Sequence, residues 1–93
     1  MNPLVSIICI SYNHAAFIKE ALNAVFSQTY EFIEVIVLDD GSQDDSQNVI
    51  REILSGKEVQ FIAHKANVGY TRTFNEGLRL AKGKFIVDFA LDD

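Results

Sequence analysis

Cysteine, proline and tryptophan are nearly absent from this chain of 93 residues, which has one cysteine, one proline and no tryptophan. A single cysteine cannot form an internal disulfide, so the chain is not a disulfide-stapled scaffold, and Cys9 fits a reducing compartment. With so little proline and only five glycines, the sequence has no composition typical of a linker. We therefore expect residues 1–93 to form a single domain.

Long apolar runs and basic stretches are missing as well. No apolar run approaches the roughly 20 residues that a membrane-spanning helix requires, and no basic region precedes the first apolar run, as a secretory signal would need. Only eight residues are Lys or Arg, and the net charge is −5. An acidic chain without a basic stripe is a poor candidate for nucleic-acid binding.

The apolar residues, 48% of the chain, follow two alternating patterns. Apolar runs predict four strands, the first of them buried on both faces: Leu4–Ile10, Ile33–Leu38, Val59–Ala63 and Phe85–Phe89. Helical spacing of apolar residues between them predicts three helices, with buried stripes at Ile18, Leu22 and Val25, at Val49, Ile50, Ile53 and Leu54, and at Phe74, Leu78 and Ala81. The order β-α-β-α-β-α-β favours an α/β fold of three layers, with helices on both faces of a mainly parallel sheet.

Short polar residues and glycines mark the expected helix ends. Ser42 is a good N-cap for the second helix, with Asp44 and Asp45 in a first turn where the helix dipole favours carboxylates. Gly56 and Gly83 are expected to end the second and third helices.

Polar side chains follow three of the four predicted strands: Ser11, Tyr12 and Asn13, then Asp39 and Asp40, and finally Asp92 and Asp93. Parallel strands all end at one edge of a sheet, which is where open α/β sheets bind their ligands. Neighbouring carboxylates repel each other unless a cation joins them, and Mg²⁺ or Mn²⁺ bound by carboxylates and substrate phosphates meets that need. These side chains therefore predict a nucleotide site with a divalent metal.

Each of these groups also has a structural interpretation. The sequence Asp39-Asp40-Gly41-Ser42 is suited to a turn and a helix cap, Tyr12 could cover the sheet edge, and the final two aspartates could be a solvated end. Neither histidine, His14 or His64, is a convincing metal ligand. The sequence lacks G-x-G-x-x-G after the first strand, a P-loop and a nucleophile elbow, so a Rossmann dinucleotide site, a P-loop nucleotide site and a serine hydrolase are not supported.

Five fragments in this order resemble the opening of family 2 glycosyltransferases. They cover essentially the whole chain: Val5–Ile8 with Ser11–Asn13, Ser27–Tyr30, Val37–Ser42, Asn67–Leu78, and Ala81–Ile86 with the terminal Asp92 and Asp93. The resemblance implies a GT-A, Rossmann-like fold of which this chain is the nucleotide-sugar-binding half. It also implies transfer of a sugar, with UDP as the expected carrier, to an acceptor hydroxyl by an inverting, metal-assisted reaction in cell-surface polysaccharide or glycoconjugate synthesis.

The resemblance also assigns roles to single residues. Tyr12 would stack on or flank the nucleobase, and Asp40, with Asp39 beside it, would accept a hydrogen bond from a uracil-type ring nitrogen. Arg72 would approach the diphosphate, which suits the planar fork of a guanidinium. The metal, Mg²⁺ or Mn²⁺, would be held by Asp92 with Asp93 next to it.

Two positions depart from the family pattern. Ala90 stands where the D-x-D metal motif has its first acid, so either Asp92 suffices together with the substrate phosphates, or Asp88 compensates, or metal binding is weakened. Phe74 stands where many members carry Arg. The catalytic base and the acceptor site of family members lie well downstream of the D-x-D motif, which places them beyond Asp93. We expect the 93-residue chain alone to be inactive.

The expected partners are a nucleotide-diphosphate sugar and a glycan, lipid-linked or other hydroxyl acceptor, with no nucleic acid. The expected location is the cytoplasm, or the inner face of the membrane where regions outside the chain associate with it. A non-catalytic nucleotide-binding α/β module is the alternative. A phosphoacceptor signalling domain fits poorly, because it would need an acidic pair after the first strand.

Overall fold

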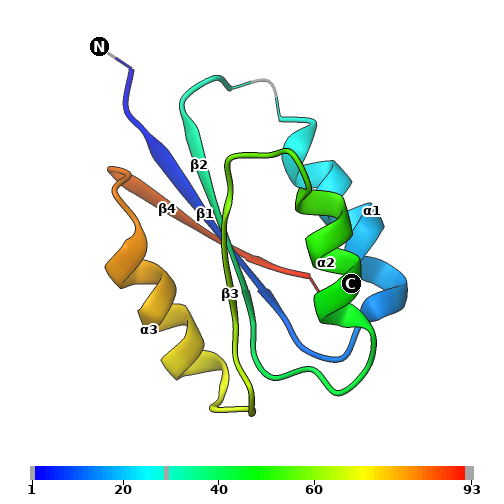
Figure 1. Cartoon of the computed structure of the whole chain (residues 1–93). Coiled ribbons are helices and arrows are strands. Elements are labelled where there is room, and N and C mark those ends of the chain that lie inside the picture. The colour runs from blue at the N-terminus through cyan, green and yellow to red at the C-terminus, as the bar shows by residue number, and fades with distance from the viewer. Residues whose placement is uncertain (1, 29, 92–93) are drawn as a thin grey trace.

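The computed structural model describes residues 2–28 and 30–91, and it contains strands and helices in the expected alternation (Figure 1). The elements are β1 (Val5–Ser11), α1 (Ala15–Phe26), β2 (Ile33–Asp39), α2 (Ser46–Leu54), β3 (Gln60–Ala63), α3 (Tyr70–Leu80) and β4 (Phe85–Ala90). The strand order is β3-β2-β1-β4, and every neighbouring pair is parallel. The predicted parallel α/β sheet is confirmed.

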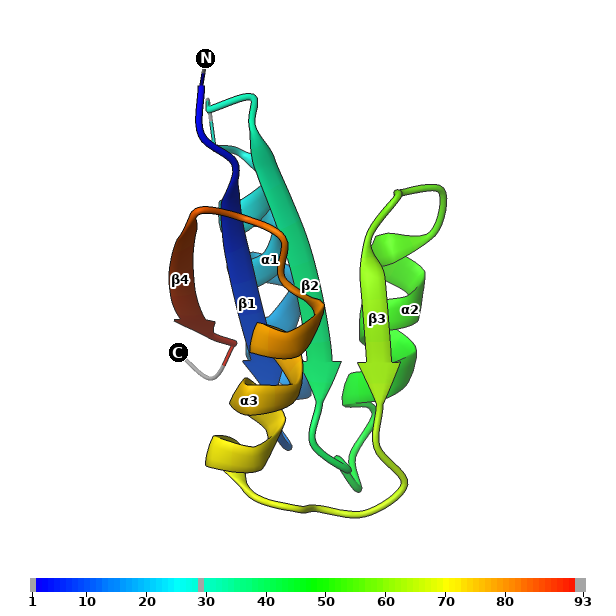
Figure 2. The same ribbon diagram turned by 90° about the vertical axis from the view of Figure 1, so that its left-hand side faces the viewer.

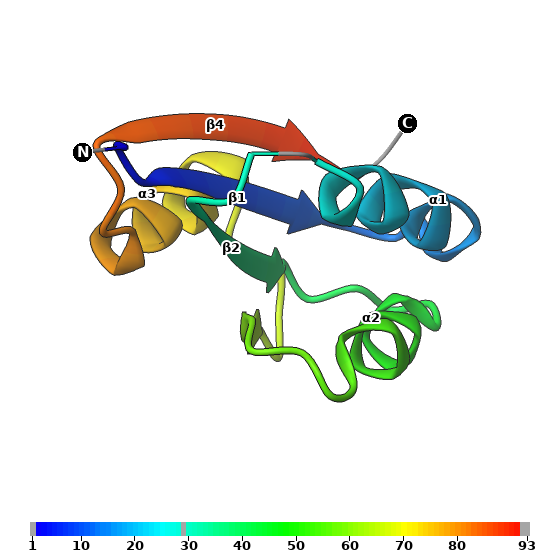
Figure 3. The same cartoon turned by 90° about the horizontal axis from the view of Figure 1, so that it is seen from above.

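Helices cover both faces of the sheet. In Figure 2, α3 lies in front of the strands, and α1 and α2 lie behind them. Seen from above, the strands run between α3 on one side and α1 with α2 on the other (Figure 3). The chain therefore has the three layers that the alternation of strands and helices predicts.

Each face of the sheet has its own apolar core. Alternate residues of β1 point to opposite faces, so Cys9 packs with α1 and α2, whereas Ile8 belongs to the core under α3. The approach of α3 depends on Gly77, because a Cβ there would lie 2.7 Å from Cγ2 of Ile8. Burial, followed by the nearby charge of Asp88, raises the pKa of Cys9 to about 12, so its thiol remains protonated.

The structure corrects two of the expected helix boundaries. Ser42 does not cap α2, which begins four residues later at Ser46 with Asp45 at the N-cap. The third helix ends at Leu80 and not at Gly83. Its buried residues are Thr73 and Gly77, while Leu78 is exposed, because the close approach at Gly77 turns the face carrying Leu78 outward.

Strand β4 is the least covered strand of the sheet. Along β4, Phe85, Ile86 and Val87 are exposed, with 53% of the surface of Phe85 accessible. Among the described residues, no helix is long and apolar enough to cross a membrane.

Candidate functional site

The carboxyl ends of the strands are joined by backbone hydrogen bonds that continue past the strands themselves. The amide of Asp40 donates to the carbonyl of Ser11, and the amide of His64 donates to the carbonyl of Asp39, both at 2.9 Å. The amide of Leu91 likewise donates to the carbonyl of Ile10 at 2.9 Å. The segments that follow all four strands therefore start from one edge.

Asn13 ties the loop after β1 to the loop after β2. Its amide donates to Oγ of Ser42 at 2.8 Å, and its side-chain oxygen accepts from the amide of Gln43 at 2.7 Å. Asn13 adopts a left-handed backbone conformation, with φ of 52°, which asparagine tolerates better than most residues. The turn after β1 is thus held in a fixed shape.

Asp39 is completely buried, and its carboxylate holds the start of the α2 segment. It accepts hydrogen bonds from the amide of Ser42 at 2.8 Å and from the Ser42 hydroxyl at 2.5 Å. Gln47 of α2 donates to the same carboxylate at 2.9 Å. Because the amide and the hydroxyl of Ser42 both donate to Asp39, Ser42 does not cap α2.

Asp40 is 2% exposed, and its carboxylate organises the turn that leads into α3. Oδ1 accepts from the amide of Val68 at 2.9 Å and lies 3.0 Å from Nδ1 of His64. Oδ2 accepts from the amide of Gly69 and from Nδ2 of Asn67, both at 3.0 Å. These contacts use all of the roughly four acceptor positions of a carboxylate.

The pKa of Asp40 lies below its ordinary value. Burial opposes the ionisation of this carboxyl, but the hydrogen bonds from the Val68 amide, His64 and the Gly69 amide favour the charged form and outweigh it. Asp40 is therefore a carboxylate at neutral pH, held by the N-terminal end of α3.

His64 lies between two carboxylates. Its Nδ1 faces Asp40, and its Nε2 lies 2.6 Å from Oε1 of Glu76 on α3. Burial disfavours the charged ring, but the hydrogen bonds to Asp40 and Glu76 outweigh it and raise the pKa of His64 above its ordinary value. This partnership was not foreseen from the sequence, because its members lie 24 and 12 residues apart.

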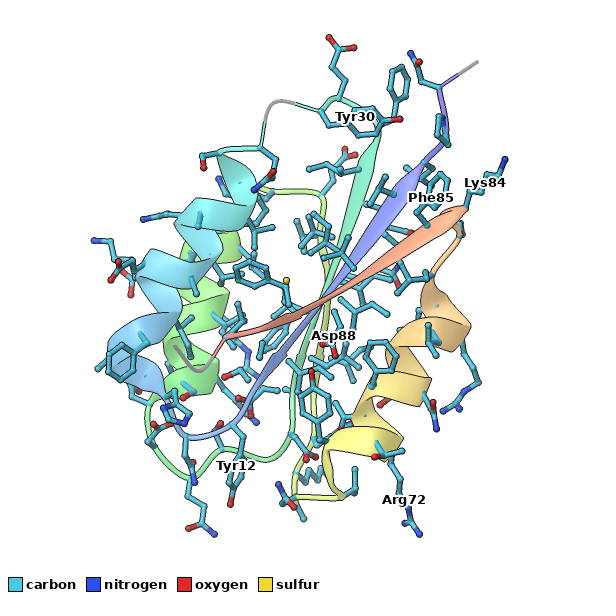
Figure 4. The ribbon with its side chains drawn as sticks, turned by 180° about the vertical axis from the view of Figure 1, so that it is seen from behind. Tyr12, Tyr30, Arg72, Lys84, Phe85 and Asp88 are labelled. Atoms are coloured by element: carbon cyan, nitrogen blue, oxygen red, sulfur yellow. The ribbon has the colours of Figure 1, made fainter. Side chains whose placement is uncertain are left out.

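A cavity of about 230 Å³ opens at this edge, and we call it the strand-end cavity. It is lined by Ile10, Tyr12, His14, Asp40, Asn67 and Tyr70. The side chain of Tyr12 is 40% exposed, and it lies at the same end of the molecule as the first turn of α3 (Figure 4). Of the predicted site residues, the structure brings Tyr12 and Asp40 to this cavity.

The other predicted site residues are placed differently. Asp39 lies beneath the edge, bonded to Ser42 and Gln47, and is not among the residues that line the strand-end cavity. Arg72 is exposed on the first turn of α3 and points away from the sheet (Figure 4). Their predicted roles toward a donor remain predictions.

The predicted metal ligands, Asp92 and Asp93, lie outside the described residues. Asp88, the suggested substitute for the missing acid at Ala90, accepts a hydrogen bond from the hydroxyl of Tyr70. Within residues 2–28 and 30–91, no group of three or more His, Cys, Asp or Glu side chains could hold a metal ion. The described residues therefore do not form a metal site made of protein ligands alone.

A larger cavity, of about 430 Å³, lies near the opposite end of the strands, and we call it the apolar hollow. Its lining is mainly apolar and includes Val5, Tyr30, Phe85, Val87 and Phe89. Such a surface offers little to orient a charged ligand. The smaller strand-end cavity is the better candidate site because polar groups converge on it.

Comparison with known proteins identifies the family of this chain. The family model described as glycosyl transferase family 2 matches residues 6–93. This chain belongs to glycosyltransferase family 2. An uncharacterized glycosyltransferase of Haemophilus influenzae is 37% identical over 92 residues, which cover 98% of this chain and 28% of the relative. The uncharacterized glycosyltransferase EpsJ of Bacillus subtilis is 35% identical over 86 residues, or 92% of this chain and 25% of the relative.

Solved glycosyltransferase structures share the fold. The mannosyltransferase PcManGT from Pyrobaculum calidifontis, in complex with GDP-Man and Mn²⁺, has a TM-score of 0.90 and 27% identity, covering 99% of this chain and 28% of that one. TarS of S. aureus, in complex with UDP-GlcNAc, has a TM-score of 0.85 and 26% identity, covering 96% and 26%. The expected GT-A fold is confirmed, and this chain spans less than a third of each of these proteins.

Proposed function

We propose that this chain forms the donor-binding portion of an enzyme that transfers a sugar from a nucleotide-diphosphate sugar to an acceptor hydroxyl. The observation that carries the proposal is the strand-end cavity, which combines an exposed tyrosine ring with a buried carboxylate in a family 2 chain. The similar structures that hold GDP-Man and UDP-GlcNAc support a nucleotide-sugar ligand of this kind.

We infer that the nucleoside enters the strand-end cavity with its base against Tyr12. The volume of about 230 Å³ is below the range of about 300–1,000 Å³ that is common for drug-sized ligands. The cavity therefore suits part of a donor, and a pyrimidine better than a purine. Contacts for the diphosphate and the sugar would come from elsewhere in the protein.

UDP is the proposed carrier because acceptor oxygens line the cavity. Asp40 and Asn67 both line it, and the imide N–H of uracil is a donor, whereas the corresponding ring nitrogen of adenine, N1, is an acceptor. Both carboxylate oxygens of Asp40 already accept hydrogen bonds from protein groups. An imide N–H that reached Asp40 would therefore donate to an oxygen that also accepts from one of those groups. The amide oxygen of Asn67 accepts no hydrogen bond from the described residues.

The proposed reaction is inverting and assisted by Mg²⁺ or Mn²⁺. A carboxylate base outside this chain would take the proton of the acceptor hydroxyl. A metal bound with the donor would neutralise the diphosphate leaving group, and Asp92 with Asp93 would hold it. The test compares the broadening of NMR signals by Mn²⁺, in the presence of UDP, between the parent and the Asp92→Asn variant. Equal broadening in the two proteins would contradict this assignment.

The proposed setting is the synthesis of a cell-surface polysaccharide or glycoconjugate, with a glycan or lipid-linked acceptor. Its support is the family resemblance alone. Screening an enzyme that contains this chain together with its acceptor-binding region against hydroxyl acceptors of both kinds, with labelled UDP-sugars, would test it. Transfer only to water would argue against an acceptor of either class.

Calorimetric titration with UDP and with ADP tests the donor proposal. One additional hydrogen bond to a buried acceptor is worth about 1–3 kcal/mol, so UDP should bind at least several-fold more tightly than ADP. GDP serves as a third ligand, because guanine also carries an imide donor but is larger. Equal affinities for UDP and ADP would show that the cavity does not recognise the imide.

A further inference from the structure

Resting on the proposed donor site, we infer that His64 is its positioning residue: as an imidazolium held between Asp40 and Glu76, it fixes one wall of the strand-end cavity and makes donor affinity depend on pH. His64 itself does not line the cavity. It acts through Asp40, Asn67 and the first turn of α3.

The geometry around the ring requires two protons. Nδ1 lies 3.0 Å from a carboxylate oxygen of Asp40, and Nε2 lies 2.6 Å from a carboxylate oxygen of Glu76. A neutral imidazole has one donor and one acceptor nitrogen, so one of these contacts would set a lone pair against a carboxylate oxygen. Only the imidazolium donates to both partners.

The charges packed against His64 come from two elements. Asp40 follows β2 and Glu76 belongs to α3, and both favour the charged ring, which accords with the raised pKa of His64. Asp39, next to Asp40 in the chain, is instead bonded to Ser42 and Gln47. The side chain of His64 is 16% exposed, so solvent screens the interaction only in part.

Asp40 transmits the state of His64 to the cavity wall. Besides His64, its carboxylate holds the amides of Val68 and Gly69 and the side chain of Asn67. Gly69 is the N-cap of α3, and the next residue, Tyr70, lines the cavity together with Asn67. The same carboxylate therefore connects the imidazolium to three consecutive residues that begin with the wall residue Asn67 and lead into the wall residue Tyr70.

Loss of the His64 proton has two consequences, and both weaken donor binding. Two carboxylates then face each other without a cation between them, which loosens the attachment of α3 to the end of β2. The site also becomes more negative by one charge, which disfavours an anionic diphosphate donor. Donor affinity should therefore fall as the pH rises through the pKa of His64.

The test measures the affinity of the chain for a UDP-sugar by calorimetry between about pH 6 and pH 8.5. Histidine is the type of side chain expected to titrate in this range. A UDP-sugar is chosen because its diphosphate is a diester, whose charge does not change in this range. We expect a loss of affinity of about tenfold across the range, a typical coupling between two sites. The His64→Gln variant should bind with the weaker affinity at every pH.

Two variants identify the group that titrates. Glu76→Gln removes one of the two carboxylates that favour the imidazolium, so the drop in affinity should move to lower pH. His14→Gln removes the other histidine near the cavity, and the pH dependence should persist in it. A pH dependence that disappears in His14→Gln and persists in His64→Gln would overturn the inference.

A second readout needs no variant. Linkage requires the donor to strengthen proton binding by His64 by the same factor by which protonation of His64 strengthens donor binding. Because a tenfold factor equals one pKa unit, saturating UDP-sugar should raise the pKa of His64 by about one unit in an NMR titration. A ring that only supports the fold would not respond to the donor. Donor binding with a flat pH profile and an unshifted His64 would overturn the inference alone, whereas no donor binding at any pH would overturn the proposed function with it.

Discussion

The two ends of the sheet carry cavities of opposite character. The apolar hollow near the amino ends has almost twice the volume of the strand-end cavity, about 430 against 230 Å³. Yet only the smaller one is built around a buried carboxylate whose oxygens are all engaged by donors. The difference teaches that size does not identify the site in this chain, whereas the convergence of polar groups from separate loops does.

The largest effect should come from adding a methyl group at Gly41, where the turn after Asp40 packs against the backbone of Ala66 and Asn67. Gly41 has φ of +76°, and a Cβ there would lie 2.4 Å from the backbone carbon of Ala66. Gly41→Ala should therefore lower the free energy of unfolding by about 2–5 kcal/mol, because left-handed strain and overpacking add. It should also weaken UDP binding, since Asn67 follows in the same turn. Urea unfolding and calorimetry measure the two effects.

Gly56 provides the matched control for that substitution. It has φ of +79°, but a Cβ there would have nothing within 4 Å. Gly56→Ala should cost only the backbone strain, roughly 1–2 kcal/mol, and leave UDP affinity unchanged. Equal losses in the two variants would mean that the contact between Gly41 and Ala66 is unimportant.

The carboxylate of Asp40 should give the next largest effect. Asp40→Asn keeps the shape but places an amide group among donors, which should cost about 1–3 kcal/mol. Because the pKa of Asp40 is lowered in the folded chain, its contribution is complete above the ordinary carboxyl pKa and is lost as the pH falls through the lowered value.

Unfolding measured against pH for the parent and for Asp40→Asn checks that sign. The variant should lose less stability than the parent as the solution becomes acidic. Asp45→Asn is the control, because Asp45 is exposed and its carboxylate bonds only to the side chain of Asn48 among the described residues. If Asp45→Asn costs as much as Asp40→Asn, burial of the Asp40 carboxylate has no special role.

Tyr12 and Tyr30 compare the two ends directly, since both are 40% exposed and they lie at opposite ends of the chain's sheet (Figure 4). Tyr12→Ala should weaken UDP binding by about 1–3 kcal/mol, as expected for the loss of base stacking. Tyr30→Ala should leave UDP affinity unchanged. Comparable losses in both variants would remove the distinction between the two cavities.

The smallest effect should follow from a change in the apolar hollow. Val87 is 41% exposed on β4, so Val87→Ser should alter the free energy of unfolding by no more than about 0.5 kcal/mol and leave UDP affinity as it is. A loss of UDP binding in this variant would indicate that the donor binds at the apolar hollow, which would contradict our account.

Local sequence patterns were enough to predict the strands and their parallel arrangement, because apolar runs that alternate with helices favour a parallel sheet covered on both faces. The same reasoning failed at Ser42, which prefers the buried carboxylate of Asp39 to the N-cap of α2. It failed at Leu78, because helical spacing does not reveal that Gly77 is the residue facing the sheet.

The candidate site was predicted in part. Tyr12 and Asp40 could be placed together because parallel strands end at one edge. The pairing of His64 with Glu76 could not be predicted, since it depends on the direction in which α3 crosses the sheet. Arg72 was assigned by resemblance, and the structure shows it pointing away from the sheet.

The most direct test of the central claim is an NMR titration of the chain with UDP, following the backbone amides of residues 2–28 and 30–91. Our account predicts that UDP shifts the amide signals of Tyr12, Asn67 and Tyr70, whereas those of Tyr30 and Val87 stay in place. Shifts confined to the residues of the apolar hollow, or no shifts at saturating UDP, would contradict the claim that the carboxyl end of the sheet is the donor site.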